Sequence, residues 1–305
     1  MAVPSDRRVL AAFASVVVLG GSNLVLVVFT ARELDPFWAA ALRFTGAAAV
    51  AWVATLLLRL PIPRGRALAT SAIYGTFAFF GGFALFYWGT QRVPASVASV
   101  VMGAVPLLTL LLAVAQGSER FRVRGAIGAV LSIAGIAVIS ARSPAGGLPI
   151  VPLLAVVGAA ASAAQSGIVV RGTRDAHPLA VNAVGMTVGA VGLLWASMLA
   201  GEPRVLPATS PVIIALLVMI VTSPMLFVLY VFVVQRWSAS AAAYQFVLFP
   251  LVSIQLAAVV LDEPISTSLI IGAPLVLLGV YVGALAPDRS VASVHSPGGS
   301  PRWKG

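Results

Sequence analysis

Apolar residues in this chain run in long blocks rather than alternating with polar ones. Breaks that hold charged residues, Pro and Gly divide the blocks into stretches of about 20 residues, the length an α-helix needs to cross a hydrocarbon core of roughly 30 Å. Strands of a membrane barrel would alternate and be half as long. The ten predicted membrane helices cover residues 9–30, 37–58, 68–90, 94–116, 124–141, 150–170, 178–200, 211–234, 239–261 and 266–286.

The composition favours an all-α, multi-pass membrane protein. Hydrophobic residues make up 60% of the chain and charged residues 9%, and the mean hydropathy is +1.04, far from the values of a soluble domain. The first apolar run follows Asp6-Arg7-Arg8 as a signal peptide would, but its length and the nine later spans favour a retained helix. The lipid bilayer is therefore the expected environment, and nucleic acid is not an expected partner.

A spaced pattern occurs twice along the chain. Pro-x12-Glu-x8-Gly-x6-Gly begins at Pro106 and again at Pro250, and Gln-Arg-x-x-Ala-Ser-x-Ala begins at Gln91 and at Gln235, so both shift by 144 residues. Five spans per copy is an odd number, and the second copy must enter the membrane in the opposite orientation. We therefore predict two inverted five-helix repeats, 1–141 and 150–286, a linker at 142–149 and a disordered cytoplasmic tail at 287–305.

These features in this order resemble the EamA unit of the drug/metabolite transporter superfamily. Gly21-Ser22-Asn23 in the first span and Pro36-x6-Arg43 in the second are similar to that family, and the resemblance covers about residues 9–286. Gly185 stands where a second arginine would repeat. The resemblance implies metabolite transport, with export as the expected direction.

The basic residues indicate orientation. The net charge is +10, and with a cytoplasmic amino terminus fourteen basic residues fall inside, four fall outside and Arg43 lies within a span. We expect a cell-membrane protein with both termini in the cytoplasm, as a monomer or a homodimer.

Arg43 is the one charge well inside a predicted span, roughly 10 Å from the outer end of its helix at the rise of an α-helix. A buried charge at this depth marks a cavity or a partner. One interpretation is binding of a substrate carboxylate or phosphate. The other is a structural anchor that bonds the carbonyls of a broken helix or pairs with Glu33 or Asp35.

Neutral polar residues gather at mid-span positions. Because spans 1 and 6 are repeat equivalents, we expect Asn23 and Gln165 to face each other across a midplane site; ordinary interhelical hydrogen bonding is the alternative. In the aromatic third span, Phe83 is a candidate for an apolar cavity wall and Tyr87 for the same wall or an interfacial belt. The polar set comprises Ser22, Asn23, Gln165, Ser166, Tyr230, Tyr244, Gln245 and Gln255, from which Ser22, Asn23, Gln165, Tyr230 and Tyr244 are predicted to contact the solute.

The repeated residues themselves suggest a scaffold. Pro106 and Pro250 lie near mid-span and predict hinges or packing kinks. Glu119 and Glu263 lie where one span ends and the next begins, and we expect them to cap helix starts, with gating as the alternative. The paired glycines predict close helix contacts.

Every Asp and Glu lies in a loop or a terminus, so the spans hold no carboxylate for a proton relay. The chain has no cysteine, and we expect no metal and no cofactor. A lipid-modifying enzyme would need a nucleophile, a base or a metal cluster at the interface, and none is evident. We therefore predict a transporter, not an enzyme, that moves a small neutral or zwitterionic metabolite such as an amino acid by alternating access. A sugar-phosphate or nucleotide-sugar-like carrier is the alternative.

Overall fold

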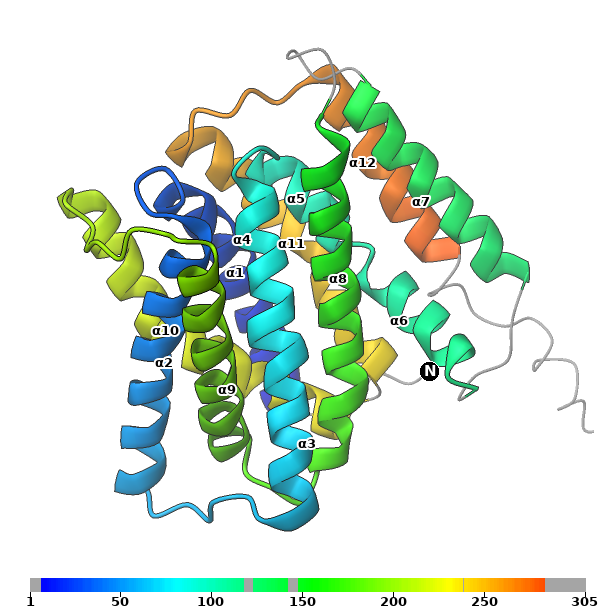
Figure 1. Ribbon diagram of the computed structural model, residues 1–305. Coiled ribbons are helices and arrows are strands. Elements are labelled where there is room, and N and C mark those ends of the chain that lie inside the picture. Colours follow the sequence, from blue (N-terminus) through cyan, green and yellow to red (C-terminus); the bar gives the residue numbers. More distant parts are fainter. Residues whose placement is uncertain (1–6, 118–122, 142–147, 238, 283–305) are drawn as a thin grey trace, which may run out of the picture.

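The computed structural model describes residues 7–117, 123–141, 148–237 and 239–282, and this part of the chain is helical throughout apart from its loops (Figure 1). In the first half the helices are α1 (Arg7–Thr30), α2 (Pro36–Leu57), α3 (Gly65–Gly75), α4 (Gly82–Thr90), α5 (Ala95–Met102), α6 (Val105–Ala115) and α7 (Val123–Ala141). In the second they are α8 (Ile150–Val170), α9 (Pro178–Leu199), α10 (Ser210–Arg236), α11 (Ala239–Val260) and α12 (Thr267–Val280).

The described helices form ten membrane segments, as predicted. Eight are long and apolar enough to cross a membrane, and α7 and α12 supply two shorter apolar helices. Segment α12 begins at Thr267 and its α-helix ends at Val280, so it is shorter than the predicted span 266–286, of which residues 283–286 lie outside the described part. The predicted tail and most of the predicted linker also lie outside it.

The bundle has two ends, which we name after residues in their loops. The Glu33 end holds loops 31–35, 91–94, 200–209 and 261–266, and helices α2, α5 and α10 begin there. The Gln116 end holds loops 58–64, 116–117 and 171–177, and α11 begins there. The sequence prediction places the Glu33 end outside the cell.

The third span is one helix with a wide turn in its middle. Residues Thr76–Gly81 form a π-helical segment between α3 and α4. Such segments insert an extra residue into the helical ladder and occur often at functional sites. Span 3 packs closely on α9, since a Cβ on Gly75 would lie 2.6 Å from the Cα of Gly185. Phe79 of the π segment and Phe86 of α4 are buried in the bundle.

The two repeated prolines act differently. The fourth span is broken rather than continuous: α5 ends at Met102, α6 begins at Val105, and Pro106 lies in the first turn of α6. Proline lacks the N–H that would bond the Met102 carbonyl four residues earlier. Pro250 instead lies inside the uninterrupted helix α11, so the helix is interrupted next to the proline in one repeat only.

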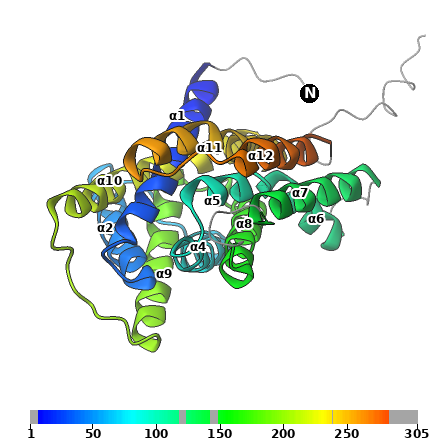
Figure 2. The ribbon, with the colours of Figure 1, turned by 90° about the horizontal axis from the view of Figure 1, so that it is seen from above.

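The repeated glycines bring α7 and α12 together at one edge of the bundle, far from α2 and α10 (Figure 2). A Cβ on Gly135 would lie 2.7 Å from the backbone nitrogen of Val276 and 2.8 Å from the carbonyl oxygen of Gly272. Backbone atoms cannot move aside as a flexible side chain does. The glycines therefore allow a helix contact that any larger residue would prevent.

Candidate functional site: a cavity between the two halves

A cavity lies in the middle of the bundle and is lined by helices of both halves. Its volume is about 80 Å³, which gives room for roughly five to eight water molecules. The first half contributes residues from α1, α2, the π segment, α4 and α5, and the second half from α8, α10 and α11. The lining residues are Val16, Gly20, Asn23, Leu24, Val27, Arg43, Ala78, Gly82, Phe83, Phe86, Met102, Ala159, Ala163, Ser166, Leu226, Phe227, Tyr230, Gln245, Phe246 and Phe249.

Arg43 is the charged residue of this lining, and its side chain is fully buried. Its Nε donates to the hydroxyl of Ser223 at 2.9 Å, and its Nη2 donates to Oδ1 of Asn23 at 2.8 Å. The guanidinium also lies against the rings of Phe44 and Phe83, 4.9 and 4.8 Å from their centroids. Its Nη1 has no hydrogen-bond partner. The site thus holds a positive charge and an unused donor.

The predicted pairing of Arg43 with Glu33 or Asp35 is wrong. The carboxylate of Glu33 accepts from the backbone of Ala208 and from the backbone and hydroxyl of Thr209 instead. The hydrogen bonds of Arg43 lead to neutral side chains on α1 and α10. Arg43 therefore links α2 to α1 and α10. No acidic group among the described residues neutralises the charge of its guanidinium.

Asn23 occupies the place predicted for it in the cavity. Its amide nitrogen donates to the carbonyl of Leu19 at 2.8 Å, which orients its oxygen toward Arg43. A second, longer contact of 3.4 Å joins it to the hydroxyl of Thr222 on α10. These hydrogen bonds hold the amide of Asn23 in one orientation, and the bond from Arg43 to Asn23 holds the guanidinium in place.

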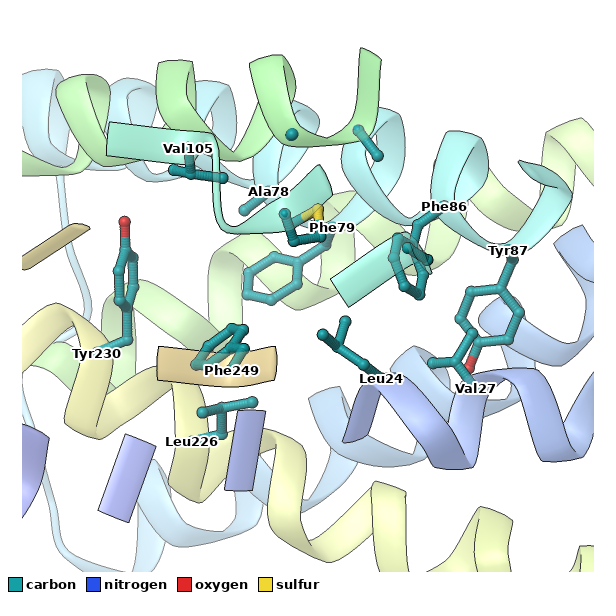
Figure 3. Close-up of a cluster of buried hydrophobic side chains, with 14 of the residues drawn as sticks. Leu24, Val27, Ala78, Phe79, Phe86, Tyr87, Val105, Leu226, Tyr230 and Phe249 are labelled. Atoms are coloured by element: carbon teal, nitrogen blue, oxygen red, sulfur yellow. The ribbon is translucent and has the colours of Figure 1, made fainter. Parts of the chain in front are cut away.

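Phenylalanine rings form the apolar wall between the two ends of the cavity. Phe83 lies 4.6 Å from Phe44 and 5.9 Å from Phe227, and Phe246 lies 4.9 Å from Phe249, all measured between ring centroids. Figure 3 shows Phe249 and Leu226 between Tyr230 on one side and Val27 with Tyr87 on the other (Figure 3). The predicted wall at Phe83 lies in the cavity lining, whereas Tyr87 packs behind Phe83 at 6.3 Å and is not part of the lining.

Gln165 does not meet Asn23. Its Oε1 accepts from Nε2 of Gln116 at 2.6 Å, near the Gln116 end. The next residue, Ser166, lines the cavity instead. Three of the lining residues of α1, Val16, Gly20 and Asn23, follow steps of four and three residues, as do Ala159, Ala163 and Ser166 on α8. A helix turns a side chain by about 100° per residue, so Ser166 faces the cavity and the adjacent Gln165 does not.

The same rotation separates Tyr244 from Gln245. Gln245 lines the cavity and is fully buried, while Tyr244 is half-buried and outside the lining. Neither amide atom of Gln245 has a hydrogen-bond partner. Ser22 is likewise outside the lining. In the sequence, Gln245 and Tyr244 are both polar and mid-span. Which of the two faces the cavity depends on how the helix is rotated about its axis, and only the structure shows that rotation.

Three carboxylates tie the two halves together at the Glu33 end. Glu263, in the second half, accepts from the backbone nitrogens of Ala95 and Ser96 at 2.7 and 3.1 Å and caps α5 of the first half. The helix start predicted at Glu263 lies later, at Thr267 with Ser266 as its cap, and Glu263 caps α5 instead. Glu119 lies outside the described residues.

Glu202 and Glu33 also cap helices of the opposite half: Glu202 of the second half caps a helix of the first, and Glu33 of the first half caps a helix of the second. Glu202, in the second half, accepts from the backbone nitrogens of Phe37 and Trp38 at 3.1 and 2.7 Å at the start of α2. Glu33, in the first half, caps the start of α10. A carboxylate at a helix start meets unpaired N–H groups and the positive end of the helix dipole. We call Glu33, Glu202 and Glu263 the carboxylate clasp.

The hydrogen bonds of the clasp stabilise the charged form of Glu33. The hydroxyl of Thr209, followed by the backbone nitrogen of Ala208, lowers the pKa of Glu33 below its ordinary value. Hydrogen bonds to the charged form of a carboxylate always act in this direction. Toward the Gln116 end, the described contacts between the halves include the neutral pairs Gln116 with Gln165 and Tyr74 with Asn182.

A ten-helix membrane bundle made of two five-helix halves, with a polar and aromatic cavity between them, defines the class of the protein as a multi-pass membrane protein built by duplication. A family model described as "EamA-like transporter family" matches it twice, at residues 7–141 and 150–284. The chain belongs to the EamA-like transporter family, which is not a family of enzymes.

Two curated relatives are also described as transporters. The chain is 28% identical over 195 residues to the uncharacterized transporter YvbV of Bacillus subtilis, covering 63% of this chain and 64% of that one. It is 29% identical over 189 residues to the uncharacterized inner membrane transporter YedA of Escherichia coli K12, covering 61% and 60%. The matches thus span less than two thirds of the relatives' lengths.

The fold is also similar to that of a solved crystal structure. The TM-score is 0.65 over 92% of this chain and 99% of the other, at 22% identity. At this identity the similarity shows the fold alone.

Proposed function

We propose that this protein carries a small solute with a carboxylate group, such as an amino acid, out of the cell by alternating access of its two halves to the cavity. The single observation that supports the carboxylate is Arg43, a fully buried guanidinium in the lining whose Nη1 is unbonded and which has no acidic partner among the described residues. A charge held in a membrane protein without a counter-ion is costly. A substrate carboxylate would supply both the opposite charge and the missing acceptor.

The size and charge of the cavity favour a small solute over the alternative carriers. A volume of about 80 Å³ favours a small solute and is too small for a nucleotide sugar in this conformation. A sugar phosphate carries up to two negative charges on its phosphate, and the cavity lining offers one cation. The observations therefore favour a single carboxylate.

The carboxylate clasp supports alternating access. Each of its members joins a loop of one half to a helix start of the other, all at the Glu33 end. Parting the halves at that end requires these hydrogen bonds to break. Among the described contacts near the Gln116 end is the neutral pair of Gln116 and Gln165. We propose that the structure has its cavity closed toward the Glu33 end. Placement of that end outside the cell rests on the distribution of basic loop residues, and export rests on the family resemblance.

The proposal is tested with purified protein in liposomes. Vesicles are loaded with radiolabelled leucine, valine, asparagine or threonine, or with the amines that lack only the carboxylate of each, and efflux is followed. We expect protein-dependent efflux of at least one amino acid and at least tenfold slower efflux of its amine. Equal rates for an amino acid and its amine, or no efflux of any of these amino acids, would contradict the proposed substrate class.

A further inference from the structure

Gln245 on α11 is a buried polar group that the fold leaves unpaired. Its side chain has 0% exposure, it lines the cavity, and neither its Oε1 nor its Nε2 has a hydrogen-bond partner. Most buried amides in proteins are hydrogen-bonded, because an unpaired donor or acceptor loses its water without compensation. Here two such atoms belong to one side chain, and the adjacent open space is the cavity.

Gln245 and Arg43 lie toward opposite ends of this cavity. Arg43 is seven residues after Pro36, the start of α2 at the Glu33 end, which is about 10 Å along the helix. Gln245 is six residues after Ala239, the start of α11 at the Gln116 end, about 9 Å from that end. In a hydrocarbon core of about 30 Å this leaves roughly 10 Å of depth between the two positions.

The space between them is apolar. Phe246 lies 4.9 Å from Phe249 and 6.2 Å from Tyr230, and these rings belong to the lining. A solute that binds both Arg43 and Gln245 must therefore have polar groups at its two ends and a short apolar segment between them. A carboxylate and a second polar group in one small amino acid, with a hydrogen bond at each end, have a comparable length.

The amide determines the chemistry of the second group. An amide offers one acceptor oxygen and two donor hydrogens. An ammonium group only donates and an ionised carboxylate only accepts, so each would leave one side of the amide unpaired. A carboxamide, and to a smaller extent a hydroxyl, both donates and accepts and can satisfy the two orphaned atoms together.

We infer that Gln245 is a specificity-determining residue, which selects carboxylate solutes that carry at their other end a neutral group able both to donate and to accept a hydrogen bond, such as a carboxamide or a hydroxyl. The inference rests on the proposed function, because it takes the carboxylate to bind at Arg43. It adds a preference that the carboxylate alone does not give.

The test uses pairs of solutes of the same shape. Asparagine and leucine differ only in that the amide replaces a branched methyl pair, and threonine and valine differ only in a hydroxyl. With the full-length protein in liposomes, we expect transport efficiency, kcat/KM, at least tenfold higher for asparagine than for leucine, and higher for threonine than for valine. A site built to bond a polar group rejects the apolar analogue strongly.

Two variants assign the preference to Gln245. Gln245→Met keeps the volume and removes both polar functions, and it should reduce the asparagine-to-leucine ratio to about one or below by improving leucine transport as well as weakening asparagine transport. Gln255→Met is the matched control, since Gln255 lies on the same helix, is exposed and is outside the lining. It should keep the ratio of the unmodified protein.

The outcomes separate this inference from the proposed function. If the unmodified protein carries leucine at least as well as asparagine, or if Gln245→Met leaves the ratio unchanged, Gln245 does not select the solute, while carboxylate transport stands. If no carboxylate solute moves, the proposed function fails and the inference fails with it. The first comparison needs no variant, so it does not depend on the folding of Gln245→Met.

Discussion

Replacing Arg43 separates its two interpretations, substrate ligand and structural anchor. The guanidinium donates at 2.9 Å to Ser223 and at 2.8 Å to Asn23, so Arg43→Gln removes two charge-assisted hydrogen bonds between helices. Each such bond contributes about 1.5–3 kcal/mol. If Arg43 is only an anchor, Arg43→Gln lowers the free energy of unfolding by the contribution of these bonds. If Arg43 also binds substrate, the variant additionally loses the bond that Nη1 makes with the solute.

The expected magnitude for transport follows from that last bond. A hydrogen bond between Nη1 and a substrate carboxylate contributes about 1.5–3 kcal/mol as one charge-assisted bond. At about 1.4 kcal/mol per tenfold change, kcat/KM for the best amino acid should fall roughly 10- to 100-fold in Arg43→Gln. Arg43→Lys keeps the charge but loses the planar fork, so we expect an intermediate loss.

The assay is efflux from liposomes together with thermal unfolding in detergent. Ser223→Ala removes one anchor bond without touching the cavity lining, and it should reduce stability with little change in KM. Arg236→Gln is the matched arginine control, because Arg236 also rests on a phenylalanine, 3.6 Å from the centroid of Phe232, but lies outside the lining. A folded Arg43→Gln protein whose KM stays within twofold of the original would refute substrate binding by Arg43.

The remaining predictions concern the clasp and the helix contacts. Glu263→Gln weakens the cap on α5 by about 1 kcal/mol, so a cysteine at Val27, which lines the cavity, should react about fivefold faster with a thiol reagent added at the Glu33 end. The chain's lack of native cysteine makes the measurement specific. Because the pKa of Glu33 is lowered from 4.5, its stabilising contribution is complete above about pH 4.5 and is lost as the pH falls through the lower folded value. The thermal midpoint should therefore fall only in that acidic range, and Thr209→Val should move the fall to higher pH. Gly135→Leu should lower the thermal midpoint by several degrees, since overpacking costs about 1–3 kcal/mol, whereas Gly125→Ala, whose Cβ would lie 3.5 Å from Leu110, should not.

Each of these predictions has a contrary result. Equal cysteine labelling with and without Glu263→Gln would show that the clasp does not hold the Glu33 end closed. A loss of thermal stability centred near neutral pH would assign the pH dependence to another group. Equal thermal midpoints for Gly135→Leu and Gly125→Ala would mean that α7 and α12 are not in close contact.

The sequence by itself determined the membrane spans, the duplication and the family. Runs of about 20 apolar residues have few alternatives to membrane helices, since backbone groups in lipid must be hydrogen-bonded within the segment. The shift of 144 residues between Pro106 and Pro250 required no structure to detect. Asn23, Arg43, Phe83 and Tyr230 were also found from polarity or aromatic character at depth, and all four line the cavity.

The tertiary structure decided which of several neighbouring polar residues face the cavity. Gln165 and Tyr244 looked equivalent to Ser166 and Gln245 in sequence, but a shift of one residue turns a side chain by about 100° around its helix. The register between helices comes from packing, here of small residues such as Gly20 against the ring of Phe249. A local pattern within one span does not contain that register.

The partners of the loop carboxylates were likewise a matter of tertiary structure. The sequence suggested that Glu263 caps a helix start, because an acid followed by proline is common there. Capping, however, depends on which unpaired N–H groups lie within about 3 Å, and the fold brings the start of α5, more than 160 residues earlier, to Glu263. Sequence determined that a carboxylate stood at the end of the bundle, and the packing of the two halves decided that it would join them.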